Sequence, residues 1–234
     1  MFQGLLRYTP YHESFGLSLI GYLSFYLIFG QTPLKRLLMP SRVAKDKEPV
    51  WLSYYASLFH AAHISISSLL YLGGYSSPYE FHLQIMNSTA YALVDMGVIT
   101  LYYEQFKKSW IQYIVHHSVM ISGAVYIHYY NHSVGATDMV ASLYLTELST
   151  ITFNISWFMI HYEMHNHTLC RLSKNITVVN YLLFRIIGMT ALTPVIYRDY
   201  SKALIPYCSV LGLNYYWFFG MLRNHFFGRN NKKK

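Results

Sequence analysis

Long apolar runs separated by short polar connections make up most of the chain. An α-helix needs about 20 mainly apolar residues to cross a bilayer, and about seven runs approach that length. Because the connections are short, neighbouring helices are expected to pack antiparallel. The pattern predicts an all-α fold, a polytopic membrane helix bundle of about seven transmembrane helices. These helices are expected at about Ser14–Gly30, Leu52–Leu72, Gln84–Tyr103, Trp110–Tyr130, Met139–Ile160, Ile176–Tyr197 and Leu204–Phe226.

The first predicted helix is short and is bounded by Gly30 and Pro33. An alternative with six transmembrane helices, in which this segment lies on the membrane surface, therefore stays open. The longest connection, Gln31–Val50, carries two prolines and most of the local charge. We expect an N-terminal helix with a basic cytosolic loop over residues 1–49, a transmembrane domain over residues 50–226, and a basic cytosolic tail over residues 227–234.

The composition indicates that lipid is the solvent for most of the surface. Of the 234 residues, 53% are hydrophobic and only 12% are charged, and the mean hydropathy is +0.22. A soluble domain is about a quarter charged. The net charge of +8 would suit a nucleic-acid partner only if the basic residues covered one face of a soluble domain. Here they lie between apolar runs, so no nucleic-acid partner is expected.

The distribution of Lys and Arg predicts the topology. Only Arg7, Arg198 and Lys202 fall on one side of the predicted membrane. The other side receives the basic residues of the first, third and fifth connections and of the tail, including Lys35, Arg36, Arg42, Lys45, Lys47, Lys107, Lys108, Arg171, Lys174, Arg223 and Arg229. Cytosolic loops carry the excess of positive charge. The N-terminus is therefore predicted to be luminal and the C-terminus cytosolic.

Ionisable side chains at bilayer depth are costly and usually face the interior of a bundle. The candidates are His60, Asp95, His116, His117, Glu147 and Arg185. A rise of about 1.5 Å per residue places them about 10 to 20 Å from the cytosolic helix ends. Their similar depth favours one shared cavity that opens toward the cytosol. The alternative is that each contact only holds neighbouring helices together.

These positions suggest specific roles. Arg185 is the natural counter-ion for Asp95 or Glu147, and Glu147 and Asn154 share one helix face. His116 and His117 point about 100° apart on a helix, and a neutral imidazole suits general-base work. In contrast, His161 and His165 have a spacing that can hold a metal, but a solvated loop is the favoured interpretation, so no metal site is predicted.

Three stretches resemble the TLC-domain family, which includes translocation-associated membrane proteins and ceramide synthases. These are Trp51 to His63, WLSYYASLFHAAH; Tyr91 to Ile121, with an intramembrane Asp followed by a His-His pair; and Leu145 to Met159, LTELSTITFNISWFM. Phe184 and Arg185 also fit the family pattern. The sequence looks closest to the transmembrane-protein-56-like branch, TLC domain-containing protein 4.

The resemblance implies helices around a lipid-sized cavity in the endoplasmic reticulum. In ceramide synthases the His pair serves N-acylation, but their H-D-x-x-D stretch is replaced here by Thr146, Glu147, Leu148 and Ser149. Fatty-acid elongases use H-x-x-H-H, and the first position of that motif is Tyr113 here. Neither activity therefore carries over directly.

Three functions are compatible with these observations. The first is a protein of lipid metabolism or homeostasis that binds or senses an acyl lipid in an intramembrane cavity, with His60, Glu147, Asn154 and Arg185 as ligand contacts. The second is an acyltransferase with acyl-CoA as co-substrate and no other cofactor, in which His116, His117 and Asp95 are catalytic. The third is a structural or assembly protein without a ligand. The partner is expected to be a membrane lipid or acyl-CoA, and the oligomeric state is left open.

Overall fold

The computed structural model describes residues 2–29, 39–40, 43, 45–107, 109–130, 133–164 and 166–227. These residues are almost entirely helical, and none of them lies in a β-strand. The fold is therefore all-α, in agreement with the prediction. The chain divides into two compact units, residues 1–145 and residues 146–234.

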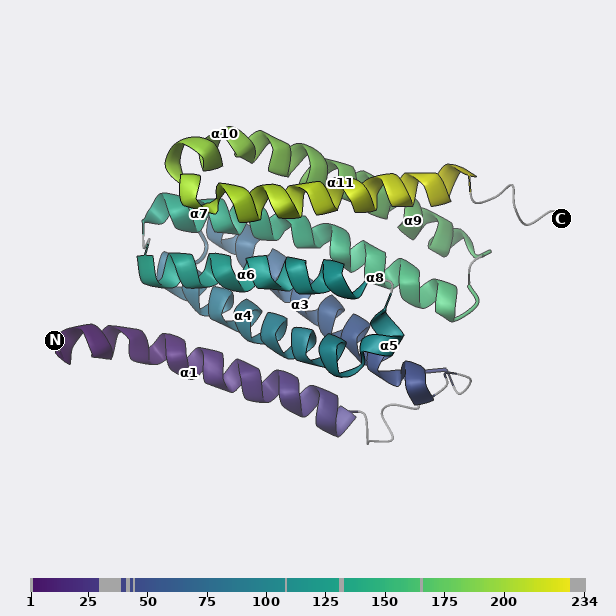
Figure 1. Cartoon of the computed structure of the whole chain (residues 1–234), viewed down its shortest axis with the longest axis horizontal. Helices are drawn as coiled ribbons and strands as arrows, with labels where there is room; N and C mark the ends of the chain where they lie inside the picture. Colours follow the sequence, from purple (N-terminus) through teal and green to yellow (C-terminus); the bar gives the residue numbers. More distant parts are fainter. Residues whose placement is uncertain are drawn as a thin grey trace. The chain divides into compact units, whose positions relative to one another are not determined.

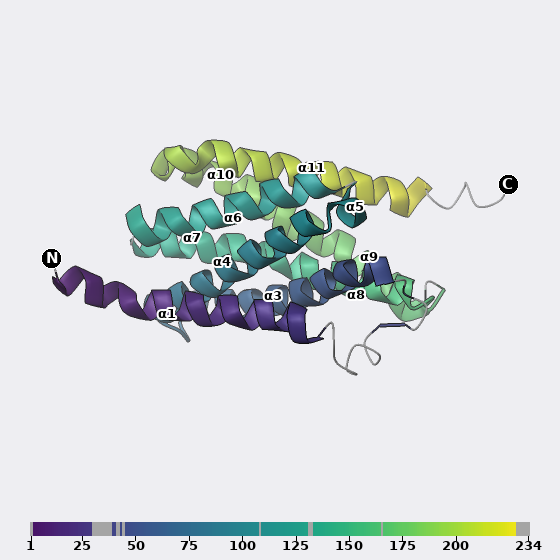
Figure 2. The same ribbon diagram turned by 60° about the horizontal axis from the view of Figure 1, so that its bottom comes forward.

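The first unit is organised around one buried helix. Its elements are α1 (Phe2–Ser24), the π-helical turn η1 (Phe25–Phe29), the short helix η2 (Lys45–Lys47), α3 (Glu48–Leu72), α4 (Pro78–Leu101), α5 (Tyr103–Phe106), α6 (Trp110–Tyr130) and α7 (Val134–Tyr144). Helix α4 packs against α1, α3, α6 and α7, and Figures 1 and 2 show α1 beside it. Since α4 contacts several helices, its side chains are well placed to join groups from them.

Local signals fix both ends of the connection between α3 and α4. Helix α3 ends at Leu72 with Gly73 as its C-cap, and Gly74 has φ +76°, a backbone conformation that glycine adopts without steric cost. Helix α4 begins with a capping box in which the Ser77 hydroxyl accepts from the Glu80 backbone N–H and the Glu80 carboxylate accepts from the Ser77 backbone N–H. Such a box satisfies N–H groups that have no partner within the helix.

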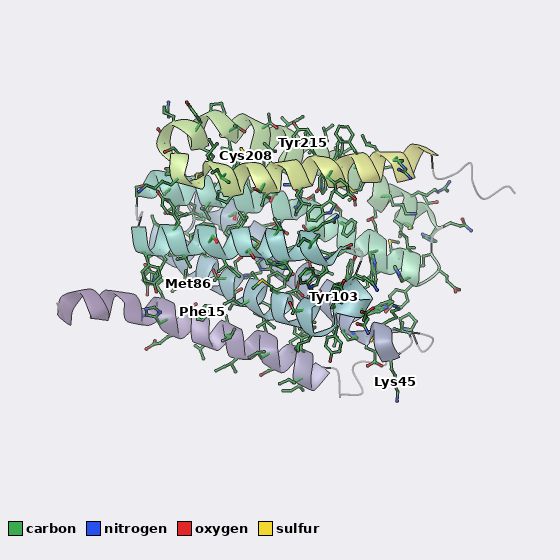
Figure 3. All side chains as sticks on the ribbon, viewed as in Figure 1. Phe15, Lys45, Met86, Tyr103, Cys208 and Tyr215 are labelled. Carbon is green, nitrogen blue, oxygen red and sulfur yellow. The ribbon has the colours of Figure 1, made fainter. Side chains whose placement is uncertain are left out.

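Helix α1 is joined to α4 by polar side chains spaced four residues apart, on one face. The Ser14 hydroxyl donates to the Leu83 carbonyl at 3.5 Å. The Ser18 hydroxyl accepts from the side-chain Nδ2 of Asn87 at 2.9 Å, and the Tyr22 hydroxyl donates to the side-chain Oδ1 of Asn87 at 3.2 Å. Partner numbers rise together along both helices, so α1 and α4 run parallel. Figure 3 marks Phe15 and Met86 on these two helices.

The opposite side of α1 is apolar and exposed, with Leu17 and Ile20 as large side chains, and Leu27 and Ile28 of η1 are exposed as well. The helical segment covers residues 2–29, so it begins well before the predicted start at Ser14. The N-terminal extension contains polar residues that the hydropathy pattern had placed outside the helix. The predicted end at Gly30 lies outside the described residues.

The second unit contains α8 (Leu148–His161), α9 (Thr168–Asn180), the π-helical segment η4 (Tyr181–Gly188), α10 (Met189–Asp199), the turn η5 (Ser201–Ala203) and α11 (Leu204–Phe227). Helix α9 packs on α8, and η4 contacts α8, α9, α10 and α11. Tyr181, Ile186 and Phe218 form its apolar cluster, in which the rings of Tyr181 and Phe218 stack at 6.1 Å. Figure 3 marks Cys208 and Tyr215 on α11.

Some of the predicted helices change their helical geometry along their length. The segment predicted at Met139–Ile160 consists of α7, the 3-10 turn η3 (Leu145–Glu147) and α8. The segment predicted at Ile176–Tyr197 contains the π-helical η4. Within the described part of the chain, one continuous helical stretch, Thr168–Asp199, is long and apolar enough to cross a membrane. The bundle of seven transmembrane helices therefore stays a prediction.

Candidate functional site

The six ionisable positions at predicted membrane depth are divided between the units. His60, Asp95, His116 and His117 belong to the first unit, and Glu147 and Arg185 belong to the second. Asn154 also lies in the second unit, buried on α8. Each unit holds a polar network of its own, and the expectation of one shared cavity stays a prediction.

Asp95 is the centre of the network in the first unit. Its Oδ1 accepts hydrogen bonds from the Ser53 hydroxyl at 2.7 Å and from the Tyr26 hydroxyl at 2.8 Å. Its Oδ2 accepts from His117 Nε2 at 2.9 Å, and the Tyr91 hydroxyl lies 3.5 Å away. The donors come from η1, α3, α4 and α6, so one carboxylate connects four helical segments.

These hydrogen bonds allow the carboxylate to remain charged while buried. Asp95 and His117 are each only 3% exposed. An ionised carboxylate has about four acceptor sites and no donor, and burying it without partners would be very costly. Here its acceptor sites are met by one imidazole and three hydroxyl groups. The result is a charge-assisted pair that the helices hold in a fixed geometry.

The pair also defines which ring nitrogen carries the hydrogen when the imidazole of His117 is neutral. Because a carboxylate only accepts, the Nε2 of His117 must carry the hydrogen of their bond. A neutral His117 then has its lone pair on Nδ1. This nitrogen is buried and has no hydrogen-bond partner among the described residues. In the neutral imidazole Nδ1 is therefore an acceptor that faces no protein donor in the part of the chain described.

His60 and His116 lie next to this pair. The ring of His60 stacks on Tyr91 at 4.0 Å with an interplanar angle of 13°, and His60 Nε2 lies 3.5 Å from the Ser88 hydroxyl. Tyr91 in turn meets the edge of His117 at 5.7 Å. The rings of His116 and His117 are 5.5 Å apart and inclined by 57°. Of the predicted pair, His117 is the one that donates to Asp95, while His116 is half-buried beside it.

The second network surrounds Arg185, which is 4% exposed. Its Nη2 donates to Glu147 at 2.9 Å and to the Thr150 hydroxyl at 2.7 Å. Its Nε donates to the Ser149 hydroxyl at 2.8 Å, and its Nη1 to the Asn214 side-chain oxygen at 3.1 Å. The counter-ion of Arg185 in the structure is thus Glu147, one of the two predicted partners.

This second network is suited to holding elements together. The guanidinium carbon lies 5.3 Å from the centre of the Tyr181 ring, and the Tyr181 hydroxyl donates to Asn214 at 3.0 Å. Arg185 itself lies in the π-helical η4, a geometry that is frequent at functional sites. Four of its five N–H donors already point at protein acceptors. Little of the guanidinium is left to meet a phosphate or carboxylate of a ligand.

Several members of these networks are not among the site residues predicted from the sequence. Tyr26, Ser53 and Tyr91 donate to Asp95, but hydroxyl groups in an apolar run are too common to single out. The spacing of Ser14, Ser18, Tyr22 and Tyr26 was a usable signal, because four-residue steps place them on one helix face. Asn214 was also detectable, as an amide within the apolar run predicted at Leu204–Phe226.

The histidines near the end of α8 have local partners. His161 stacks on Trp157 at 3.8 Å and bonds its carbonyl oxygen, and His167 caps the start of α9. His165 lies outside the described residues. In the described portion of the chain, no group of three or more His, Cys, Asp or Glu side chains has the arrangement of a metal site.

The helical fold, the buried Arg185–Glu147 ion pair and the buried Asp95–His117 hydrogen bond define a protein whose helices are held together by polar groups in an apolar interior. The TLC domain matches residues 17–223, which is most of the chain. The protein belongs to the TLC-domain family. Membership is consistent with membrane association and with a lipid-related function. No curated protein matches the chain.

Proposed function

We propose that this protein binds an acyl lipid among its membrane-spanning helices and that the polar group of the lipid contacts His117. The single observation that carries the proposal is the buried Asp95–His117 pair, whose Nδ1 has no hydrogen-bond partner among the described residues. A buried acceptor without a donor costs about 1–3 kcal/mol. A hydroxyl or amine on a lipid would remove that cost.

The chemistry of the two networks favours the first unit as the ligand site. The negative charge of Asp95 disfavours the binding of an anionic phosphate nearby, because like charges repel. A neutral hydroxyl or an amine is not repelled. Arg185 is occupied by Glu147 and by neighbouring hydroxyls. Of the expected ligand contacts, His60 lies beside the proposed site through Tyr91, and Glu147 and Asn154 belong to the second unit.

The wider proposal places the protein in the membrane of the endoplasmic reticulum. Seven spans with a luminal N-terminus and a cytosolic C-terminus are supported by the distribution of Lys and Arg. The family match supports membrane residence. The same proposal includes membership of the transmembrane-protein-56-like branch. It is supported by the order and spacing of the three stretches Trp51 to His63, Tyr91 to Ile121 and Leu145 to Met159.

Native mass spectrometry of the detergent-purified protein tests the binding proposal. The wild type is compared with His117→Gln and with the control His161→Gln, which changes an exposed histidine. We expect a lipid on the wild type and the control, and a loss of about tenfold in His117→Gln, because 1.4 kcal/mol corresponds to a factor of ten. Equal retention by all three proteins would contradict the proposal.

A second candidate function is acyl transfer from acyl-CoA, which the Asp95–His117 geometry favours. In this reaction Nδ1 removes the proton from a hydroxyl or amine while that oxygen or nitrogen bonds to the thioester carbonyl carbon. The carbon–sulfur bond then breaks, and the leaving CoA sulfur takes the proton from the imidazolium. Asp95 holds the imidazole in place through Nε2, as a carboxylate does beside other general bases.

The transfer reaction is tested by mixing purified protein with acyl-CoA and membrane lipids and measuring released CoA. Loss of a general base lowers a rate by about 10²–10⁴. We expect that loss in His117→Gln and in His116→Ala/His117→Ala, but not in His161→Gln. If the double variant releases CoA at the wild-type rate, the transfer reaction is excluded. If the wild type neither retains lipid nor releases CoA, a structural role without ligand is left.

A further inference from the structure

We propose that Tyr26, together with Ser53, is a positioning residue that fixes His117 in its Nε2–H tautomer by holding the carboxylate of Asp95. This proposal deepens the proposed function and rests on it only in naming His117 as the ligand contact. It concerns a residue of the N-terminal helical segment, which the sequence pattern had not connected with the histidine pair.

The two carboxylate oxygens of Asp95 accept hydrogen bonds from different sets of donors, and this difference supports the proposal. Both Tyr26 and Ser53 donate to Oδ1, at 2.8 and 2.7 Å. His117 donates to Oδ2 at 2.9 Å. Two donors from different helices on one oxygen define the plane of the carboxylate and therefore the direction of the other oxygen. The side-chain torsion that turns a carboxylate is broad and roughly two-fold, so without these donors rotation would be less restricted.

The tautomer follows from that direction. With Oδ2 aimed at Nε2, the hydrogen of a neutral imidazole is held on Nε2 and the lone pair is left on Nδ1. The hydrogen bond made by one ring nitrogen sets the state of the other. If the carboxylate turned away, the buried imidazole would lose this preference. Tyr26 therefore acts on His117 through Asp95.

The position of Tyr26 is itself set by the packing of α1 on α4. One turn earlier, Tyr22 donates to Asn87 at 3.2 Å and its ring meets Tyr91 at 5.5 Å. Asn87 also donates to Ser18 at 2.9 Å. Together these contacts fix the register of the two parallel helices, and the Asn87–Ser18 hydrogen bond and the Tyr22–Tyr91 ring contact do not require the Tyr22 hydroxyl. Tyr26 follows in the π-helical η1. Its hydroxyl donates to Asp95, while the other donors to this carboxylate come from α3, α4 and α6.

Tyr22 provides a matched control, because it is a tyrosine on the same helix face whose hydroxyl bonds Asn87 and not Asp95. Tyr22→Phe and Tyr26→Phe each delete one hydroxyl group and keep the ring. Ser53→Ala removes the other donor to Oδ1 and provides an independent variant in case Tyr26→Phe does not fold. Circular dichroism of each purified variant reports whether the helices have formed.

The experiment is nitrogen NMR of protein labelled with ¹⁵N-histidine, purified in detergent, at a pH where His117 is neutral. The His117 signal is the one that disappears in His117→Gln. We expect the Nε2–H tautomer in the wild type and in Tyr22→Phe, and a mixture of tautomers in Tyr26→Phe and Ser53→Ala. An unchanged tautomer in folded Tyr26→Phe overturns the proposal, and so does an equal change in Tyr22→Phe.

Lipid retention by the same proteins separates this proposal from the proposed function. If the tautomer depends on Tyr26 but the wild type retains no lipid, the positioning role stands and lipid binding fails. If lipid retention depends on His117 while the tautomer is indifferent to Tyr26 and Ser53, lipid binding stands and the positioning role fails.

Discussion

His117 donates from Nε2 to Oδ2 of Asp95 at 2.9 Å, and both side chains are almost completely buried. The two residues are 22 positions apart and come from α4 and α6. Removing the imidazole from a buried carboxylate leaves one of its acceptor sites without a donor, which is costly in an apolar interior. Substitutions at Asp95 or His117 are therefore expected to affect the other residue as well.

Replacing Asp95 by Asn tests the charge of the pair while nearly preserving its shape. The amide of Asn can present either oxygen or nitrogen to His117, so the imidazole loses its defined tautomer. We expect lipid retention to fall by about tenfold, for a cost of about 1.4 kcal/mol, measured by native mass spectrometry. Retention at the wild-type level would show that the carboxylate is not needed for binding.

The pair between Arg185 and Glu147 predicts the stability of the second unit. Arg185→Met leaves Glu147 buried at 6% exposure without its cation, and removing one partner of a buried pair costs about 3–5 kcal/mol. We expect a correspondingly lower free energy of unfolding in detergent. Arg171→Met, at an exposed position of α9, serves as the control and should change stability little.

A double variant separates pairing from packing. Replacing both Arg185 and Glu147 by Met removes the two buried charges together, and apolar replacements of a buried pair are often neutral or stabilising. We expect the free energy of unfolding of the double variant to be higher than that of Arg185→Met alone. A double variant that is less stable by the sum of both single changes would mean that the two side chains do not interact.

The polar contacts between α1 and α4 predict how firmly α1 is held. Ser18→Ala and Tyr22→Phe each remove one hydrogen bond to Asn87. Interhelical hydrogen bonds of this kind contribute about 0.6 kcal/mol each. We therefore expect faster hydrogen exchange in α1 of the double variant, with exchange in α3 unchanged. Ser67→Ala is a suitable control, because its hydroxyl bonds a carbonyl of its own helix.

The capping box at the start of α4 predicts a pH dependence outside the expected membrane span. Hydrogen bonds from the backbone N–H and the hydroxyl of Ser77 lower the pKa of Glu80 below its ordinary value. A folded-state pKa below the unfolded value gives stability that is complete above the unfolded pKa and is lost as pH falls through the folded pKa. We expect amide protection in the first turn of α4 to fall in that acidic range.

Glu80→Gln is the control for this pH effect. The glutamine side chain can still accept from the Ser77 backbone, but it does not titrate. Protection of the first turn should then be independent of pH in the variant. If the wild type and Glu80→Gln lose protection at the same acidic pH, another group is responsible.

Much of the helical pattern was predictable because it depends on the order of apolar residues. The apolar runs at Leu52–Leu72, Trp110–Tyr130 and Leu204–Phe226 coincide closely with α3, α6 and α11. The start of α1 at Phe2 was not predicted, because hydropathy marks membrane-length apolar runs and does not detect a helical continuation with polar residues. The 3-10 and π-helical turns at Leu145–Glu147 and Tyr181–Gly188 were also missed, since they depend on packing.

By itself, the sequence determined that the protein is helical, which residues are apolar, and which ionisable groups stand in apolar surroundings. The family match over residues 17–223 rests on the same linear information. Only the tertiary structure decided that Asp95 pairs with His117 and Arg185 with Glu147, and that Tyr26 reaches Asp95. The physical reason is that a hydrogen bond requires atoms about 3 Å apart with a defined direction, and helix packing brings together residues that the chain separates by dozens of positions.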